Sequence, residues 1–533
     1  MRAHPFLIAA ALTPFVLFGQ AHEHRVDLGN IGKVHLTTSC NPAAQGEIDR
    51  AVALLHSFWY SEAEKSFRHA AQSDPQCGMA WWGVAMSNLH PVWAPPTPSE
   101  LNTGREAAVK AKATGAKTER ERALIDAINT YYADSDKLDH HSRMAAYEKA
   151  MAEVSAANPD DHEAAIFHAL AILGVVDPRD KTYANQKKAG EILNRILPLE
   201  PRHPGIAHYI IHSFDYPELA NLALPAARMY AKLAPGAPHA LHMPSHIFTR
   251  LGLWDESIAS NLASAAKARD YVAHAMPGST SFEELHAVDY LVYAYLQRGE
   301  TDKAFRLVQR LNEVAKVDTP NIAAAYALAA VPARYALERR QWKEAAALTL
   351  PKTNVSWEKF PYAEANTRFA IALGAARSNQ PELAQRAIDR LAAIQQTLVE
   401  QKDRYWADQV EIQRLGAAAW LAHAQTKEDE ALRQMHAAAD LEASTEKHPV
   451  TPGAVMPARE LLSEMLLDLG KPEESLAEAV HALHDAPNRY NGLWLAAQAA
   501  QRAGKPEEAQ SYRAKMVQLR KGAIATITTM SAR

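Results

Sequence analysis

The chain has 533 residues, which is too many for one hydrophobic core, so several domains or an extended repeat array are expected. Its formal net charge is −4 and neither sign of charge forms a long run, which argues against nucleic acid or an anionic membrane surface as the main partner. Histidine is frequent, with 24 residues, and several of them fall in apolar periodic segments.

The N-terminus has the pattern of a secretory signal. Residues 1–21, MRAHPFLIAAALTPFVLFGQA, start with the basic Arg2, continue through an apolar stretch and end on a small-x-Ala pattern, Gly19-Gln20-Ala21. The apolar stretch is short for a bilayer span, and no later segment approaches about 18 uninterrupted apolar residues. We therefore expect cleavage after Ala21, a periplasmic or secreted protein, and no stable transmembrane anchor; an uncleaved N-terminal anchor is the alternative.

The two cysteines of the chain, Cys40 and Cys77, lie beyond the signal, the first of them in an N-terminal arm predicted over residues 22–45. In an oxidising compartment an even pair is more simply a disulfide than a catalytic thiol. The bond is expected to tie the arm to the end of the first helical hairpin and to stabilise the fold by roughly 3–4 kcal/mol.

The rest of the chain is predicted to be helical nearly throughout, because apolar residues recur at i, i+3, i+4 and i+7 and strand-like alternation is almost absent. A period of 34 residues separates four pairs of residues: Pro201 and Pro235, His208 and His242, His212 and His246, and Gly470 and Gly504. This is the period of the tetratricopeptide repeat (TPR), a helix–turn–helix unit that buries its apolar face only by stacking on its neighbours. The sequence therefore predicts an all-α fold, a right-handed α-solenoid of TPR-type repeats with loop insertions.

Insertions interrupt the period at residues 90–101, 175–186, 273–284 and 444–457. Long insertions in a compact array are typical of lids, partner loops or groove walls. The predicted parts are an N-terminal TPR array with a histidine-rich groove over residues 46–310, central helical repeats over 311–450, a C-terminal TPR pair over 451–520 and a tail over 521–533.

Four segments carry a family resemblance: SCNPAAQGEIDRAVALLHSFWY, DPQCGMAWWGVAMS, HPGIAHYIIHSFDYPELA and APHALHMPSHIFTRLG. The chain resembles exported bacterial TPR proteins that contain such segments, although Ile48 stands where an aromatic residue is expected. The resemblance covers most of the chain after the signal and includes both cysteines and the histidine segments. It implies the solenoid fold and export, and it implies no particular activity.

The histidine segments have a fixed phase within the repeat. In a TPR unit the first helix lines the concave groove, and its groove-facing positions lie about 13, 10, 6 and 3 residues before the turn glycine. Counting back from Gly252, and from the turns of the repeats on either side, gives the predicted groove residues. These are His208, His212, Asp215, His239, His242, His246, His286, Asp289 and Tyr293, with Arg250 beside them as a bidentate partner for a carboxylate.

Two of these histidine pairs suit metal binding. His208/His212 and His242/His246 are i, i+4 pairs, which lie on one helix face with Cβ atoms about 5–6 Å apart. These four histidines are the candidate ligands, Asp215 and Asp289 would complete a mixed set, and zinc or another late first-row divalent ion is expected, with copper an alternative in an exported protein. The pairs lack the glutamate of an H-E-x-x-H metalloprotease motif, and Pro244 predicts a helix start or a kink between His242 and His246.

Three functional hypotheses remain open from the sequence. The leading one is an exported scaffold whose groove binds a peptide, a protein segment or a small polar ligand. The alternative is a metal-binding protein or a metal-dependent, hydrolytic enzyme that uses the groove histidines, and the third is a structural histidine network. No motif indicates a reaction, so whether the protein is an enzyme stays undecided.

Overall fold

The computed structural model describes residues 27–530, with side chains described as far as Arg520. The predicted signal over residues 1–21, its cleavage site after Ala21 and the end of the predicted tail lie outside the described residues. Across the part that is described, no helix combines the length and the apolar character needed to cross a membrane.

The described residues form twelve successive helix pairs, in each of which a first helix turns back into a second. The first six pairs are α1 (Pro42–His56) with α2 (Tyr60–Ser73), α3 (Gly78–Ser87) with α4 (Pro98–Thr114), α5 (Glu119–Tyr132) with α6 (His140–Ala157), α7 (His162–Leu173) with α8 (Ala184–Ile196), α9 (Pro204–Phe214) with α10 (Ala220–Leu233), and the divided helix α11 (Pro238–His242) and α12 (Pro244–Arg250) with α13 (Trp254–Ala275).

The remaining pairs are α14 (Phe282–Gln297) with α15 (Thr301–Asn312), α16 (Ile322–Glu338) with α17 (Trp342–Ala346), α18 (Pro361–Ala376) with α19 (Pro381–Glu400), α20 (Arg404–Ala424) with α21 (Glu428–Ala443), α22 (Ala458–Asp468) with α23 (Pro472–Asp485), and α24 (Tyr490–Arg502) with α25 (Pro506–Met530). A short 3-10 helix, η1 (Trp357–Lys359), precedes α18. Each pair packs on the next, so the prediction of an all-α solenoid built from TPR-like units is confirmed.

The turns within the pairs explain the spacing of glycines in the sequence. Gly252, Gly299, Gly470 and Gly504 follow the first helices of their pairs, with φ between 65° and 74°. Glycine adopts this left-handed conformation at little cost because it has no Cβ atom, so it commonly ends a helix. Pro244 lies at the start of α12 and divides the first helix of the sixth pair, since a proline has no N–H to donate to the preceding turn.

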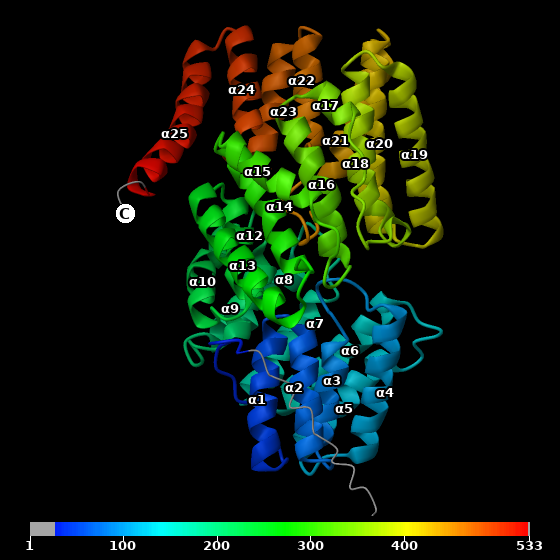
Figure 1. Ribbon diagram of the computed structural model, residues 1–533, viewed down its shortest axis with the longest axis vertical. Coiled ribbons are helices and arrows are strands. Elements are labelled where there is room, and N and C mark those ends of the chain that lie inside the picture. The colour runs from blue at the N-terminus through cyan, green and yellow to red at the C-terminus, as the bar shows by residue number, and fades with distance from the viewer. Residues whose placement is uncertain (1–26, 531–533) are drawn as a thin grey trace, which may run out of the picture.

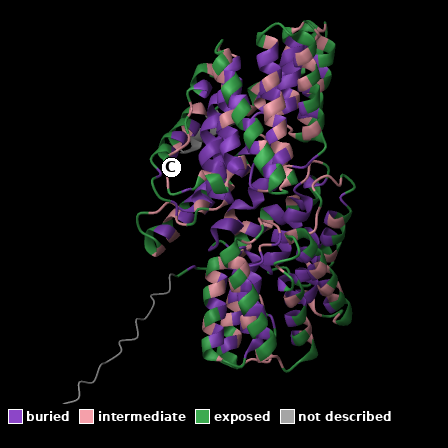
Figure 2. Cartoon of the chain, turned by 90° about the vertical axis from the view of Figure 1, so that its right-hand side faces the viewer, coloured by how far each residue is buried: buried purple, intermediate pink, exposed green. Residues whose placement is uncertain are grey.

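The stack of pairs curls back on itself twice. Helix α1 of the first pair contacts α9 of the fifth, and α14 of the seventh contacts α24 of the twelfth. In Figure 1 the two turns of the stack lie one below the other, with α9 to α14 between them. Figure 2 shows buried residues along the inner sides of the helices and exposed ones on the outside. The inner side of the solenoid is therefore covered, which matters for the histidine segments.

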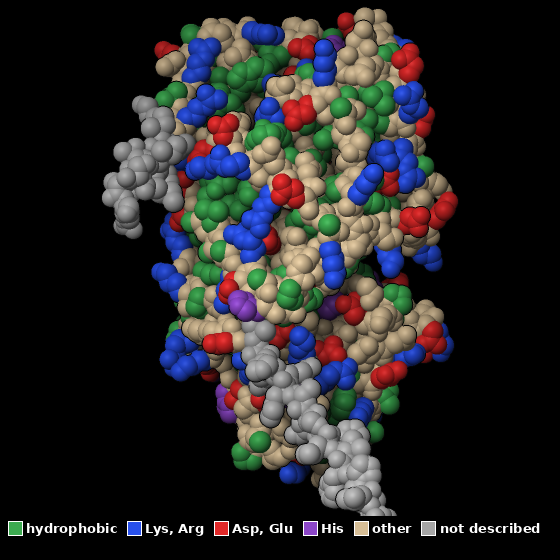
Figure 3. Space-filling model, viewed as in Figure 1, with side chains coloured by type: hydrophobic (Ala, Val, Ile, Leu, Met, Phe, Trp, Pro, Cys, Tyr) green, Lys and Arg blue, Asp and Glu red, His purple; other side chains and the backbone are tan. Residues whose placement is uncertain are grey.

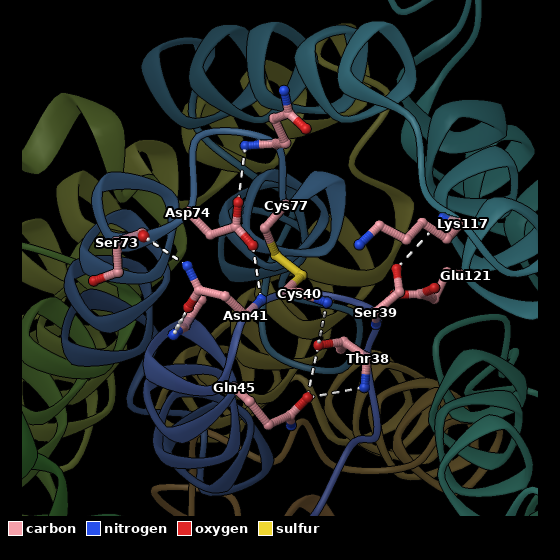
Figure 4. The surroundings of a disulfide bond; sticks show 12 residues. Thr38, Ser39, Cys40, Asn41, Gln45, Ser73, Asp74, Cys77, Lys117 and Glu121 are labelled. Carbon is pink, nitrogen blue, oxygen red and sulfur yellow. Dashed lines mark hydrogen bonds between the residues drawn. A yellow bond between two sulfur atoms is a disulfide. The ribbon is translucent and has the colours of Figure 1, made fainter.

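The predicted disulfide between Cys40 and Cys77 is present, with Cα atoms 5.1 Å apart (Figure 4). Beside it the Asn41 side chain accepts from the backbone N–H of Ala44 and so caps α1. Farther back in the arm, the carbonyl of Asn30 accepts from the N–H of Gly236 at 2.7 Å. The disulfide thus anchors an arm that reaches from the first helix pair to the loop before α11.

Candidate metal centre

Six histidines meet in the interior, between the two turns of the solenoid. His208 and His212 lie on α9, His239 and His242 on α11, His246 on α12 and His286 on α14. Each is at most 4% exposed. On the face of the molecule in Figure 3 few histidines are visible, and basic and acidic side chains are interspersed. The structure brings these predicted residues together, but in a closed interior instead of an open groove, because the solenoid curls over them.

The six side chains form two groups of three. We call His208, His212 and His239 the first triplet, and His242, His246 and His286 the second triplet. Within each triplet, one nitrogen from each ring lies within 4.8 Å of the others. The ring centroids of His239 and His242 are 6.1 Å apart and those of His212 and His246 are 6.2 Å apart, so the triplets are neighbours.

Hydrogen bonds fix the tautomers in the second triplet. Nδ1 of His242 is 2.6 Å from Oδ1 of Asn261, and the Asn261 amide nitrogen donates to the Ser257 carbonyl, so the oxygen must face the histidine. Nδ1 of His246 is 2.9 Å from Oδ2 of Asp215. Both Nδ1 atoms therefore carry the proton and donate it. The two Nε2 atoms, 3.0 Å apart, then both present lone pairs.

In the first triplet only the tautomer of His208 is fixed in this way, since Nδ1 of His212 has no hydrogen-bond partner among the described residues. Nδ1 of His208 donates to the carbonyl of His56 at 2.6 Å, which leaves a lone pair on Nε2, 3.1 Å from Nε2 of His212. Nδ1 of His239 faces Oε2 of Glu283 at 3.7 Å, while its Nε2 has no hydrogen-bond partner among the described residues. Both ring nitrogens of His286, in the second triplet, also lack one there.

Burial lowers the pKa values of five of these imidazoles. It lowers the pKa of His246 to about 4, against the carboxylate of Asp215, which raises it. Burial, together with the neighbouring imidazoles, also lowers the pKa values of four further ring systems well below the usual range: His208, His212, His242 and His286. A neutral imidazole is the form that binds a metal ion, so the cluster offers unprotonated nitrogen ligands at neutral pH.

Asp215 lies behind His246 and not among the nitrogen ligands, where the sequence had placed it in a mixed set. Besides His246 it accepts from Nε of Arg250 at 2.9 Å and from Nζ of Lys447 at 2.9 Å. Burial opposes its ionisation, but Lys447 and Arg250 lower its pKa well below the usual value. Arg250, which the sequence predicted to bind a carboxylate, thus pairs with Asp215 of the protein itself. Asp215 also orients the ring of His246.

The other two predicted groove residues pair with arginines. Oδ1 of Asp289 is 3.4 Å from Nε of Arg334, and burial raises the pKa of Asp289 to about 6. The hydroxyl of Tyr293 is 3.0 Å from Nη1 of Arg489. Neither residue has a hydrogen bond to a histidine among those found between described residues. Asp289 and Tyr293 stand at the positions that His242 and His246 occupy one repeat earlier, so the i, i+4 histidine pair does not recur in this repeat.

A third group of metal-ligand type, which the sequence did not reveal, has a different character. Glu163 accepts from Nε2 of His56 at 3.0 Å and from Nε2 of His203 at 2.8 Å. Nδ1 of His56 is hydrogen-bonded to the hydroxyl of Tyr209 at 2.8 Å. Because the carboxylate already has two imidazole donors, these residues are held by their own hydrogen bonds, although Nδ1 of His203 has no partner among the described residues. The network positions the His56 backbone, whose carbonyl accepts from Nδ1 of His208.

The insertion at residues 444–457, which we call the inner loop, covers the cluster. The hydroxyl of Tyr290 lies 3.3 Å from Nε2 of His246, and the carbonyls of Pro449 and Thr451, at 3.2 and 3.1 Å, share its single proton. Arg334 donates to the carbonyls of Gly453 and Ala454. Together with the Lys447–Asp215 pair, these contacts fasten the loop along the inner side of the solenoid.

The inner loop forms part of the wall of a cavity of about 540 Å³. Its wall includes aromatic and amide side chains: Tyr326, Tyr362, Phe369, Tyr405, Trp406, Asn366, Gln409 and Gln413. Arg250 and Lys447, the partners of Asp215, also line it. The cavity and the histidine cluster therefore share the ion-pair network of Asp215, Arg250 and Lys447.

Comparisons with known proteins leave the function open. No protein-family model matches the chain, and a search of characterised proteins finds no match. Among solved structures, the human IFIT1 dimer with m7Gppp-AAAA superposes with a TM-score of 0.38 and 12% identity, covering 83% of this chain and 90% of that chain. The TPR domain of P58(IPK) gives a TM-score of 0.21 and 13% identity, covering 81% and 99%. Both superpositions are loose, so the function has to be argued from the site.

Proposed function

We propose that the protein is a metal-binding α-solenoid whose six-histidine cluster holds a late first-row transition metal. The observation that carries the proposal is the pair of Nε2 atoms of His242 and His246. They lie 3.0 Å apart with lone pairs facing each other, because both Nδ1 protons are donated elsewhere. Such a contact in a buried site is unfavourable unless a cation lies between the two nitrogens.

The distance itself fits a shared ion. Two nitrogen ligands bound at about 2.0–2.1 Å, and separated by about 90–110° at the metal, stand roughly 2.9–3.4 Å apart. The 3.0 and 3.1 Å separations in the two triplets fall in that range. A proton is the other cation that could bridge two imidazoles, but burial disfavours the charged ring at neutral pH.

The surroundings of the rings also support this function. Metal-binding histidines characteristically donate their second N–H to a carboxylate, carbonyl or amide oxygen, which fixes the tautomer and orients the ring. His246 does so to Asp215, His208 to the His56 carbonyl and His242 to Asn261. An exported location, as proposed from the sequence, would be supported by the disulfide, since such bonds persist in oxidising compartments.

The test is elemental analysis of the purified protein beside a His212→Ala/His246→Ala variant. We expect stoichiometric zinc, copper or a related metal in the unmodified protein and its loss from the variant. His274→Ala, whose side chain is 68% exposed, is the matched control and should keep the metal. A protein that remains metal-free after incubation with these ions, yet loses much thermal stability in the double variant, would instead indicate a structural histidine network.

A second candidate function is recognition of a peptide, a protein segment or a small polar ligand, and the 540 Å³ cavity beside the inner loop favours it. Aromatic walls with a few amide groups are typical of ligand pockets. This candidate places recognition at the cavity and not at the buried histidines. A metal-free protein that stays folded and binds such a ligand there would favour it over the metal centre.

A further inference from the structure

We infer that the cluster is a paired copper centre, in which each triplet holds one cuprous ion. The inference rests on the proposed metal-binding function and adds the number of ions and the kind of metal. It comes from the relation between the two triplets, the charges around them and the aromatic residues that enclose them.

The two triplets are the same site repeated once along the solenoid. The first consists of an i, i+4 pair, His208 and His212, and a third ligand, His239, from the start of the next repeat. The second consists of the equivalent pair and a third ligand at the equivalent place, 13 residues before the next turn glycine: His242, His246 and His286. Because one repeat step maps one triplet onto the other, the simplest occupancy is one ion for each.

The contacts within and between triplets agree with two adjacent ions. His239 packs on His208, with ring centroids 5.0 Å apart, and His286 packs on His242 at 4.2 Å. The ring contacts that join the triplets are 6.1 and 6.2 Å, close to the 6.3 Å between His246 and His286 within the second triplet. The ring nitrogens of each triplet nevertheless lie within 4.8 Å of one another, so each set of three can hold its own ion beside the other.

The charge of the surroundings selects the metal. All six candidate ligands are imidazoles, which supply no negative charge, the carboxylate of Asp215 is already paired with Arg250 and Lys447, and the carboxylate of Glu283 faces Nδ1 of His239 at 3.7 Å. Two divalent ions would bring four positive charges into this buried site without anionic ligands, whereas two monovalent ions bring two. Since burying unpaired charge is costly, a metal with a stable monovalent state is favoured, and among the ions that imidazole binds well this is copper.

Aromatic side chains close the pair off from water. Trp93 packs edge-on against the third ligand of each triplet, at 5.6 Å from His239 and 5.3 Å from His286. Phe58 packs against His208, His212 and His239. A dry environment with three imidazole ligands and no carboxylate ligand stabilises the lower oxidation state, because the divalent ion loses more hydration energy on entering it.

The test is an anaerobic titration of the metal-free full chain with Cu(I) against a chromophoric chelator. We expect two equivalents of copper in the unmodified protein. The variants His208→Asn/His212→Asn and His242→Asn/His246→Asn should each retain one equivalent, and the control His274→Asn should retain two. Circular dichroism of each variant reports whether it is folded, and the stoichiometry of the unmodified protein does not depend on any variant.

Several results would overturn the inference. One equivalent of copper in the unmodified protein would show a single shared centre and would leave the proposed metal-binding function standing. Two equivalents of Zn(II), retained against an excess of Cu(I), would overturn only the choice of copper and would leave the paired centre standing. Binding of neither metal would remove both the inference and the proposed function.

Discussion

Replacing Asn261 by alanine separates a metal-binding role of the cluster from a structural one. Asn261 is fully buried on α13, and its Oδ1 accepts the Nδ1 proton of His242 at 2.6 Å. Once this acceptor is gone, a metal-free His242 can move its proton to Nε2 and donate it to Nε2 of His246, 3.0 Å away. The new hydrogen bond offsets the lost one, so the metal-free protein should lose less than about 1 kcal/mol of unfolding free energy.

Metal binding should respond differently to the same change. The ion needs the Nε2 lone pair of His242, so it must drive the proton back to an Nδ1 atom that no longer has an acceptor. Loss of such an outer partner typically costs about 10–100-fold in metal affinity, or roughly 1.4–2.7 kcal/mol. The second triplet should show this loss in a chelator competition, while urea unfolding of the metal-free protein changes little.

Ser264→Ala is the matched control for this experiment. Ser264 is also buried on α13 and donates to the carbonyl of Pro238 at 2.9 Å, and among the described residues it has no hydrogen bond to a ring nitrogen. It should lower the stability by about 0.5–1.5 kcal/mol and leave metal affinity unchanged. If Asn261→Ala instead cost the metal-free protein 1–3 kcal/mol and left metal affinity within twofold, the tautomer argument would be refuted.

Two further predictions concern stability. Replacing both Cys40 and Cys77 by serine should lower the unfolding free energy by about 4 kcal/mol, because the disulfide closes a loop with a sequence separation of 37. Urea unfolding measures this loss. A reductant should then have no effect on the stability of the variant. Burial raises the pKa of Asp289 to about 6, above its usual value of about 3.8, so the folded state holds this proton more tightly than the unfolded state does. The stability contributed by the protonated carboxyl is complete below pH of about 4 and lost as pH rises through about 6, by up to about 3 kcal/mol. Asp289→Asn should flatten that part of the stability profile, and an unchanged slope would contradict the assignment.

The fold and the grouping of the histidines could be predicted because both follow from local periodicity. The 34-residue period and the 3.6-residue turn of a helix place His208, His212, His242 and His246 on equivalent faces of adjacent repeats, whatever the rest of the chain does. The helix start at Pro244 could also be predicted, because the missing N–H of a proline affects only the adjacent turn of its own helix.

The enclosure of the site could not be predicted, because it depends on contacts between distant parts of the chain. His208 is held by the carbonyl of His56, 152 residues earlier, and Asp215 by Lys447, 232 residues later. The first contact arises because the solenoid curls until α1 meets α9, and the second because the inner loop docks inside it. Asn261 carries no signal in the sequence, since one asparagine on an apolar helix face looks like any other.

The inner loop has a consequence for how an ion would reach the histidines. Lys447, Tyr290 and Arg334 fasten it across the cluster, so ions in solution and ions at the triplets are separated by a folded segment of the protein. Exchange of a bound ion then proceeds no faster than the undocking of that segment. Loading of the folded protein and release from it would both follow local opening of that segment, so their rates would be set by its undocking and a titration would need time to reach equilibrium.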